Sequence, residues 1–293
     1  MNQQGNLYRF EGLPGPVLLK SCEDLLPILR AILRDWDINR ITAEQEREPL
    51  IEIELTPEGY RRSSQWLNKE SCFKHPVDAA CDFIVDLIHA YLSDRPDLLC
   101  LHCAAVEFPE GLVLFPNTYR SGKSTLAMKL VSRGLRLFSD DVLPLSVADR
   151  LGMALGILPR LRIPLPDTAD DHFRSYIDRH SGPLNNRYLY SDLDMTGLAH
   201  LGEKAPVRAI TVLERSDGAD TTIEEAGKGE ILKDVILRNF ARQGTALNIL
   251  DTLYSLVEQC DCYTLRYDNL EEATDLLISE FGAPAIRCST GNG

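Results

Sequence analysis

Apolar and polar positions in the first third of the chain follow two alternating patterns. Short apolar runs with a period of two are typical of strands, and two longer stretches repeat every three to four positions, as amphipathic helices do. The pattern predicts strands at 8–10, 16–19 and 50–55 and helices over 24–33 and from Pro76 to about residue 94. We therefore expect a smaller N-terminal α/β domain over residues 1–97.

The remaining residues alternate between apolar runs and amphipathic stretches, which predicts a second and larger α/β domain over 98–293. Strands are expected at 98–106, 111–115, 135–138, 209–214 and 262–267, and helices over 125–131, 229–240, 246–259 and 270–281. Residues 166–200 are polar and expected to be irregular, forming either a lid over a substrate or a plain surface excursion. The tail 282–293 is expected to be disordered.

A phosphate-binding loop is predicted between the strand at 111–115 and the helix at 125–131. In such a loop the backbone N–H groups and the positive end of the helix dipole face the phosphates. Lys123 would neutralise the β- and γ-phosphates, and the Ser124 hydroxyl would hold Mg²⁺. The expected nucleotide contacts, including ATP phosphates, are Asn117, Thr118, Tyr119, Arg120, Ser121, Gly122, Lys123, Ser124 and Thr125.

The start of this loop departs from the usual pattern. Asn117 stands where a glycine is common, and Tyr119 and Arg120 replace small residues. Asn tolerates positive φ better than most residues, so the turn can still form. The plain alternative is a solvated loop before an ordinary helix.

A pair of aspartates, Asp140 and Asp141, follows the strand at 135–138. We expect this strand directly beside the one at 111–115, because the helix between them is too short for another crossover. Both carboxylates would then lie at the carboxyl edge of the sheet, where ligands bind in open α/β folds. Asp141 would hold Mg²⁺ with Ser124, and Asp140 would accept a proton from an attacking hydroxyl. The alternative is that the pair only ends a strand and begins a turn.

The segment from Leu101 to Leu145 resembles the P-loop core of the HPr kinase/phosphorylase superfamily, and most of all the bacterial HPr-kinase-related kinases. The residues that carry the resemblance are Leu101-His102-Cys103-Ala104-Ala105-Val106, Lys123-Ser124 and Arg133-Gly134-Leu135-Arg136-Leu137-Phe138-Ser139-Asp140-Asp141-Val142. A weaker likeness covers much of 98–281. The resemblance implies a fold shared with phosphoenolpyruvate carboxykinase and an ATP- and Mg²⁺-dependent transfer of phosphate to a hydroxyl group.

The resemblance also implies a role for His102, because the related kinases carry a histidine on the strand before the P-loop. A histidine there can contact the phosphoryl group or orient an aspartate, whereas the alternative is a hydrogen-bonded core histidine. Two departures argue against HPr itself as acceptor and against phosphorolysis. Thr125 stands where HPr kinases usually carry glutamate, and residues 156–164 replace their signature rich in Glu, Arg and Gly.

Several other side chains are candidates for ligand binding. Arg160 and Arg162 share one face of a strand because they are two residues apart, and they can clamp a γ-phosphate or an acidic substrate. Exposed strand arginines are also common. Arg208 and Arg215 flank a later strand and are weaker candidates. The chain's two tryptophans, Trp36 and Trp66, are expected to pack in the N-terminal domain.

Composition narrows the function classes. The net charge of −13 over 293 residues argues against a general nucleic-acid partner. No apolar stretch is long enough to span a membrane, and the first residues lack the basic and apolar regions of a signal peptide. Most of the eight cysteines are expected to be buried in a reducing compartment, and Cys100 and Cys103 should point to opposite faces of one strand. We expect a cytoplasmic protein.

These observations lead to one main functional hypothesis. The protein would be an ATP-dependent kinase whose acceptor is a serine of a protein or peptide, or a small metabolite. A homo-oligomer is compatible with the sequence. A catalytically weak nucleotide-binding regulatory module and a P-loop ATP hydrolase are the alternatives. Against a hydrolase, no separate apolar strand ends in Asp-Glu, and no guanine-specific motif is present.

Overall fold

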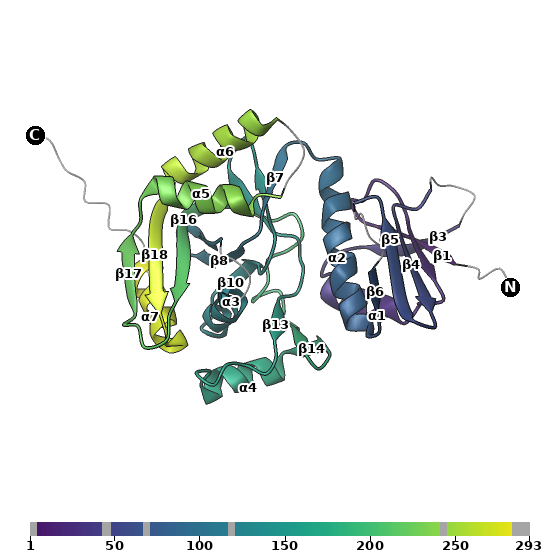
Figure 1. Ribbon diagram of the computed structural model, residues 1–293, viewed down its shortest axis with the longest axis horizontal. Coiled ribbons are helices and arrows are strands. Elements are labelled where there is room, and N and C mark those ends of the chain that lie inside the picture. The colour runs from purple at the N-terminus through teal and green to yellow at the C-terminus, as the bar shows by residue number, and fades with distance from the viewer. Residues whose placement is uncertain (1–4, 43–47, 67–70, 117–120, 241–244, 283–293) are drawn as a thin grey trace, which may run out of the picture.

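The computed structural model describes residues 5–42, 48–66, 71–116, 121–240 and 245–282. Over these ranges the chain is a mixed α/β protein with seven helices and three sheets (Figure 1). The expected α/β class is thus confirmed at this coarse level. Within the same ranges no helix is long and apolar enough to cross a membrane.

The N-terminal part is a six-stranded sheet with two helices. The strand order is β3-β1-β2-β4-β5-β6. Its elements are β1 (Asn6–Phe10), β2 (Val17–Lys20), α1 (Leu25–Ile32), β3 (Ile38–Ile41), β4 (Ile51–Thr56), β5 (Gly59–Ser64), β6 (Ser71–Phe73) and α2 (Pro76–Ser93). Strands β1, β2 and β4 and both helices confirm the sequence pattern.

Strands β3, β5 and β6 were not expected from the sequence. In β5 the reason is a charged residue on the buried side. Arg62 is 3% exposed, and its guanidinium contacts the carboxylates of Asp82 and Asp86 on α2. Because a buried charge is tolerated only when it is paired, this arginine interrupts the apolar pattern by which strands are predicted.

Helix α2 lies between the N-terminal sheet and the rest of the molecule (Figure 1). Pro76 occupies its first turn, and the His75 ring accepts a hydrogen bond from the Val77 N–H at 3.2 Å. Both features favour a helix start at this point. On the sheet side, Phe83 packs on Phe10 of β1 with ring centroids 5.3 Å apart.

Hydrogen bonds join the N-terminal part to the segment before β13 (Arg160–Arg162). The indole N–H of Trp36 donates to the Leu155 carbonyl at 2.7 Å, and the Leu158 N–H donates to the Ile32 carbonyl at 2.9 Å. The Trp36 ring also packs on Tyr91 at 5.4 Å. Trp36 therefore has the packing role expected of it.

The second sheet has nine strands. They run in the order β10-β8-β9-β16-β12-β11-β7, and β18 and β17 continue from β16. The strands are β7 (Leu98–Leu101), β8 (Ala104–Phe108), β9 (Gly111–Phe115), β10 (Arg136–Ser139), β11 (Leu143–Ser146), β12 (Leu151–Met153), β16 (Lys204–Arg215), β17 (Thr222–Glu225) and β18 (Asp261–Tyr267). The long strand β16 holds the sheet together, since its start pairs with β12 and its later residues pair with β9 and β18.

The expected strand at 98–106 is wrong in one respect, because it breaks into β7 and β8. At the break, the His102 N–H donates to the Arg238 carbonyl at 2.8 Å instead of to a neighbouring strand. The two pieces then pair with different partners, β7 with β11 and β8 with β9 and β10. Cys100 and Cys103 accordingly do not lie on one continuous strand, although both are buried.

The predicted neighbour of β9 is also wrong. β8 lies between β9 and β10 and is antiparallel to both, so β9 and β10 run parallel to each other. Helix α3 (Lys123–Ser132) makes the crossover between them, although the sequence predicted that it would be too short to do so. Ten residues of helix span about 15 Å, and strands two places apart are separated by roughly 10 Å. The carboxyl ends of β9 and β10 still meet at one edge, as expected.

Residues 166–200 are more regular than expected. They contain α4 (Asp171–Arg179), β14 (Ser181–Leu184) and β15 (Tyr188–Ser191), and β15 pairs with β13 (Arg160–Arg162) to complete a three-stranded sheet. Phe173 and Ile177 are buried, and Asp170 caps α4 by accepting a hydrogen bond from the Phe173 N–H at 2.8 Å. Phe173 and Ile177 are four residues apart, so they lie on the same face of α4 and anchor this otherwise polar helix.

The remaining helices confirm the sequence pattern. They are α5 (Lys228–Arg238), α6 (Ala246–Gln259) and α7 (Leu270–Phe281). α5 packs on α6, and α7 packs on α3. Lys129 of α3 is 1% exposed and contacts the carboxylates of Asp170 and Glu271, so it joins the starts of α4 and α7 to α3. The tail expected to be disordered lies outside the described residues from 283 onward.

Candidate functional site

The N-terminus of α3 has the geometry that a phosphate-binding helix needs. Gly122 directly precedes the helix with φ 89°, a left-handed conformation that favours glycine, and no side chain caps this end. A Cβ on Gly122 would lie 2.7 Å from the Tyr267 hydroxyl oxygen, which leaves no room for a side chain. The Tyr267 hydroxyl in turn donates to the Ser121 carbonyl at 3.4 Å. Asn117, Thr118, Tyr119 and Arg120 lie outside the described residues.

Three of the predicted catalytic and metal-binding side chains meet beside this helix end. The Lys123 ammonium lies 3.0 Å from Asp141 Oδ1, and His102 Nε2 lies 3.4 Å from the same oxygen. Lys123 comes from α3, Asp141 follows β10, and His102 stands at the break between β7 and β8. The break in the predicted strand is thus what brings His102 to the carboxylate.

Asp140 is the most enclosed carboxylate of the site, at 8% exposure. Its Oδ2 accepts a hydrogen bond from the Arg160 N–H at 2.9 Å. Its Oδ1 is buried and has no hydrogen-bond partner among the described residues. A buried oxygen of this kind is costly to leave unpaired, which makes it a candidate to meet a proton or a cation.

The environments of the two aspartates push their pKa values apart. Burial raises the pKa of Asp140, and the neighbouring charge of Asp141 raises it further. Burial also opposes the ionisation of Asp141, but Lys123 and His102 outweigh it and hold the pKa of Asp141 below its usual range. A pair of this type contains one group suited to accept a proton and one that stays ionised.

His102 is also shifted by its surroundings. Burial lowers its pKa, and the nearby charges of Lys123 and Arg238 act in the same direction against the opposing effect of Asp141. The lowered pKa favours the neutral imidazole, which can still form a hydrogen bond with Asp141.

The predicted arginine pair is on one face of β13, as expected. The guanidinium carbons of Arg160 and Arg162 lie 4.8 and 5.9 Å from the centre of the Tyr188 ring. Arg160 is half-buried beside the carboxylates and contacts the Cys81 thiol, whereas Arg162 is exposed. Only Arg160 is placed beside the aspartates by the described contacts.

The two weaker arginine candidates, Arg208 and Arg215, lie in different parts of the structure. Arg208 pairs with Glu110 at 3.1 Å and also contacts Asp261, so it belongs to a surface ion-pair cluster. Arg215 lines a small hollow together with Gly122 and Thr125. The fold therefore brings Arg215, but not Arg208, to the side of the predicted phosphate loop.

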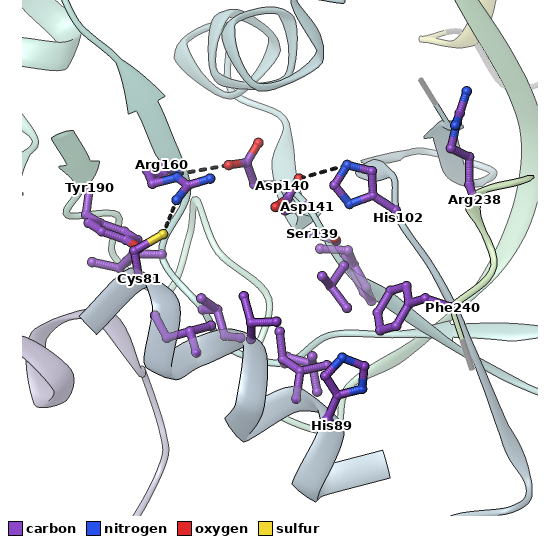
Figure 2. A pocket seen from close by; sticks show the side chains of 18 of the residues that line it. Cys81, His89, His102, Ser139, Asp140, Asp141, Arg160, Tyr190, Arg238 and Phe240 are labelled. Atoms are coloured by element: carbon purple, nitrogen blue, oxygen red, sulfur yellow. Dashed lines mark hydrogen bonds and ion pairs between the residues drawn. The ribbon is translucent and has the colours of Figure 1, made fainter. Parts of the chain in front are cut away.

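A cavity of about 520 Å³ opens beside the aspartates. Pockets of roughly 300–1,000 Å³ are the usual size for small-molecule ligands. Figure 2 shows His102, Asp140 and Asp141 across from helix α2, while the Arg160 guanidinium reaches Cys81 at one end of the α2 wall. Sequence reasoning missed the α2 wall, because it assigned that helix to the N-terminal core alone. The residues of α2 that line the cavity are Cys81, Ile84, Val85, Ile88 and His89.

The donor set fits a Mg²⁺ ion bound together with phosphate. Mg²⁺ in phosphoryl-transfer sites usually takes one or two carboxylates and completes its shell with substrate phosphates and water. Ser124 lies close enough to Asp140 to favour the ionised carboxylate. Within the described residues no group of three or more His, Cys, Asp or Glu side chains could hold a metal. A cation here would therefore depend on oxygens from a ligand.

Comparison with known proteins gives little further information. No family model and no curated protein matches the chain. Among solved structures, the chain is similar to the Hpr(Ser) kinase/phosphatase from Coxiella burnetii, with 13% identity and a TM-score of 0.32. The match covers 62% of this chain and 94% of that protein.

Proposed function

We propose that this protein is an ATP- and Mg²⁺-dependent kinase that transfers the γ-phosphoryl group to a hydroxyl acceptor. The proposal rests on one observation. A lysine at an uncapped helix N-terminus pairs with one carboxylate of two adjacent aspartates whose pKa values diverge, at the edge where β9 and β10 both end and beside a cavity. The acceptor is the serine of a protein or peptide, or a small metabolite.

The nucleotide half of the site would consist of residues 121–125. Their backbone N–H groups and the helix dipole would bind the phosphates, and Lys123 would neutralise part of their charge. Ser124 and Asp141 would hold Mg²⁺, which supplies charge neutralisation on the phosphate oxygens. The ion pair between Lys123 and Asp141 supports this arrangement, because it keeps both charges at one point before a ligand arrives.

The acceptor half would depend on Asp140. Its raised pKa makes it a better proton acceptor than an ordinary aspartate, and its Oδ1 has no competing hydrogen bond in the described part of the chain. The hydroxyl of the acceptor would donate to this oxygen while its own oxygen attacks phosphorus. His102 would orient Asp141 through the 3.4 Å contact.

A nucleotide-binding module with little turnover is the second candidate. The Lys123–Asp141 ion pair also favours it, because a phosphate must compete with a protein carboxylate for the lysine. A P-loop hydrolase would use the same residues with water in place of the acceptor. The three functions differ in whether phosphate is transferred, released or left on ATP.

The deciding experiment is phosphate transfer from γ-labelled ATP to a cell extract and, separately, to its small-molecule fraction. Wild type should label an acceptor, and Asp140→Asn should not. Label that appears only as inorganic phosphate would favour the hydrolase. ATP binding without loss of the γ-phosphate in either fraction would favour the module.

A further inference from the structure

The cavity has two chemically different walls. On the side of α2, positions three and four apart present one helix face to the cavity, as Ile84, Val85 and Ile88 do. Leu155, Leu158 and Phe240 extend this apolar lining. The carboxylates lie on the other side, and Arg160 lies at one end of the cavity, where it contacts both Asp140 and Cys81 of α2 (Figure 2). A ligand that fills the cavity must therefore be apolar at one end and polar at the other.

The polar wall contains a cation that has no direct carboxylate contact among the described residues. The carboxylates of Asp140 and Asp141 act on the Arg160 charge from beyond 4.0 Å, and its guanidinium contacts the Cys81 thiol and the Tyr188 ring. A thiol is a weak acceptor, so most of the five N–H donors of this arginine remain for a ligand. Guanidinium groups in partly buried sites bind carboxylates in a two-point geometry.

The cation and the proposed base are neighbours. The backbone N–H of Arg160 donates to the Asp140 carboxylate at 2.9 Å. The backbone from which the Arg160 side chain extends therefore lies next to this carboxylate. A molecule that meets both must carry an anionic group and a hydroxyl group close together. An apolar chain attached to them would extend toward α2.

We propose that this cavity is the acceptor site and that the acceptor is a small hydroxy acid with an apolar chain. Its carboxylate would bind Arg160, its hydroxyl would face Asp140, and its chain would lie on Ile84, Val85 and Ile88. This inference rests on the proposed kinase function and selects the small-molecule acceptor over the polypeptide. In the reaction the acceptor oxygen forms a bond to the γ-phosphorus, the bond from that phosphorus to the leaving ADP oxygen breaks, and the hydroxyl proton passes to Asp140.

Binding without ATP tests the cavity separately from catalysis. The probes are β-hydroxybutanoate, β-hydroxyhexanoate and β-hydroxyoctanoate, titrated calorimetrically into the full-length protein, with the matching diols as neutral analogues. Affinity should increase roughly fourfold for each methylene that enters the apolar wall. The diols should bind at least about tenfold more weakly than the acids of equal length.

Two pairs of variants locate the binding. Val85→Trp should abolish the chain-length dependence by filling the cavity, whereas Leu250→Trp, at a similarly exposed position on α6, should not. Arg160→Gln should weaken the acids about tenfold and leave the diols unchanged. Arg187→Gln is the matched control, since Arg187 also lies on the Tyr188 ring, at 5.1 Å, but is exposed.

The outcomes separate this inference from the kinase proposal. Saturable binding with these variant effects, but without phosphorylation in the presence of Mg·ATP, would keep the cavity site and reject the kinase. Phosphorylation of a protein in cell extract that Val85→Trp leaves unchanged would overturn the small-molecule site and keep the kinase. No saturable binding of any probe, or binding that Val85→Trp and Arg160→Gln do not change, would overturn the inference outright.

Discussion

The ammonium group of Lys123 lies 3.0 Å from the carboxylate of Asp141. One residue begins the helix after the predicted phosphate loop, and the other follows a strand that lies two places away in the sheet. The lysine is 7% exposed but the Asp141 side chain is 45% exposed, so solvent screens the pair in part and its strength lies between that of a buried and a surface pair. A phosphate bound to Lys123 would also lie close to the negative carboxylate of Asp141. A cation bound together with the phosphate would be needed to offset their repulsion.

Loss of the lysine charge should weaken nucleotide binding. We expect Lys123→Ala to reduce the affinity for Mg·ATP at least roughly tenfold, because a charge-assisted contact to phosphate contributes about 1.5–3 kcal/mol. Calorimetry on the folded variant measures this, with Lys233→Ala on the exposed side of α5 as control. Equal affinity in Lys123→Ala and wild type would remove the phosphate-loop assignment.

Loss of the proposed base should affect transfer more than binding. Asp140→Asn should keep Mg·ATP affinity and lower the rate of phosphate transfer by roughly 10²–10⁴, the usual contribution of a positioned general base. Asp178→Asn, an exposed carboxylate on α4, is the control. If Asp141→Asn lowers transfer while Asp140→Asn instead weakens Mg²⁺ binding, the two roles are exchanged.

The same substitution should stabilise the fold at neutral pH. The pKa of Asp140 is raised by burial and by Asp141, so ionising it costs folding free energy. The cost is full above the raised pKa and disappears below the pKa of the unfolded chain. Asp140→Asn should therefore melt at higher temperature than wild type at pH 7, and the difference should vanish as the pH falls below the normal aspartate range. A variant that melts lower at pH 7 would contradict the pKa direction.

Asp170 offers a test with the opposite sign. Burial opposes its ionisation, but Lys129 and the Phe173 N–H outweigh this and lower its pKa. Its contribution is therefore present above the unfolded pKa and lost as the pH falls through the lowered one. Asp170→Ala should cost about 1–3 kcal/mol at pH 7, since a helix cap and a partner of buried Lys129 are both removed. Chemical denaturation at a series of pH values from 7 into the strongly acidic range measures this, and Asp171→Ala is the control. An effect that stays constant over the whole series would contradict it.

Hydrogen exchange can test whether residues 166–200 act as a lid. Because Phe173 and Ile177 are buried, we expect the amides of α4 to be protected without any ligand. Mass spectrometry of the free protein and of its Mg·ATP complex gives the comparison. Strong protection of α4 only in the complex would instead support a lid that closes on the ligand, as the polar composition suggests.

Local patterns predicted much of this fold. The helices α1, α2, α3, α5, α6 and α7 and the strand before the phosphate loop follow from the local pattern of apolar residues. Strand β5 was missed because buried Arg62 is compensated by carboxylates about twenty residues later in the chain. Pairings of this kind are invisible in a local window.

Some features of the candidate site could be predicted from the sequence, whereas others could not. Lys123, Asp140 and Asp141 follow from motif and spacing, and the structure brings them together. The order β10-β8-β9 could not be inferred, because it depends on where α3 crosses the sheet. The cavity wall on α2 was missed because α2 is buried on two faces, and periodicity alone does not say which neighbour covers each face. The residues at positions 81, 84, 85, 88 and 89 share one face of α2, and this stripe was the signal in the sequence from which the cavity wall could have been predicted.

The two-sided burial of α2 has a consequence for dividing the chain. A protease cut or a gene truncation near residue 97 would separate Phe83 and its sheet partners from Leu155, and it would leave Trp36 without its carbonyl acceptor. The larger fragment would keep Lys123 and both aspartates but would lose one wall of the cavity. Such a fragment should still recognise nucleotide, and adding back the separately produced smaller fragment should restore whatever the cavity binds. The cavity therefore depends on both parts of the sequence, and substitutions along α2 should be matched by changes at the segment it faces.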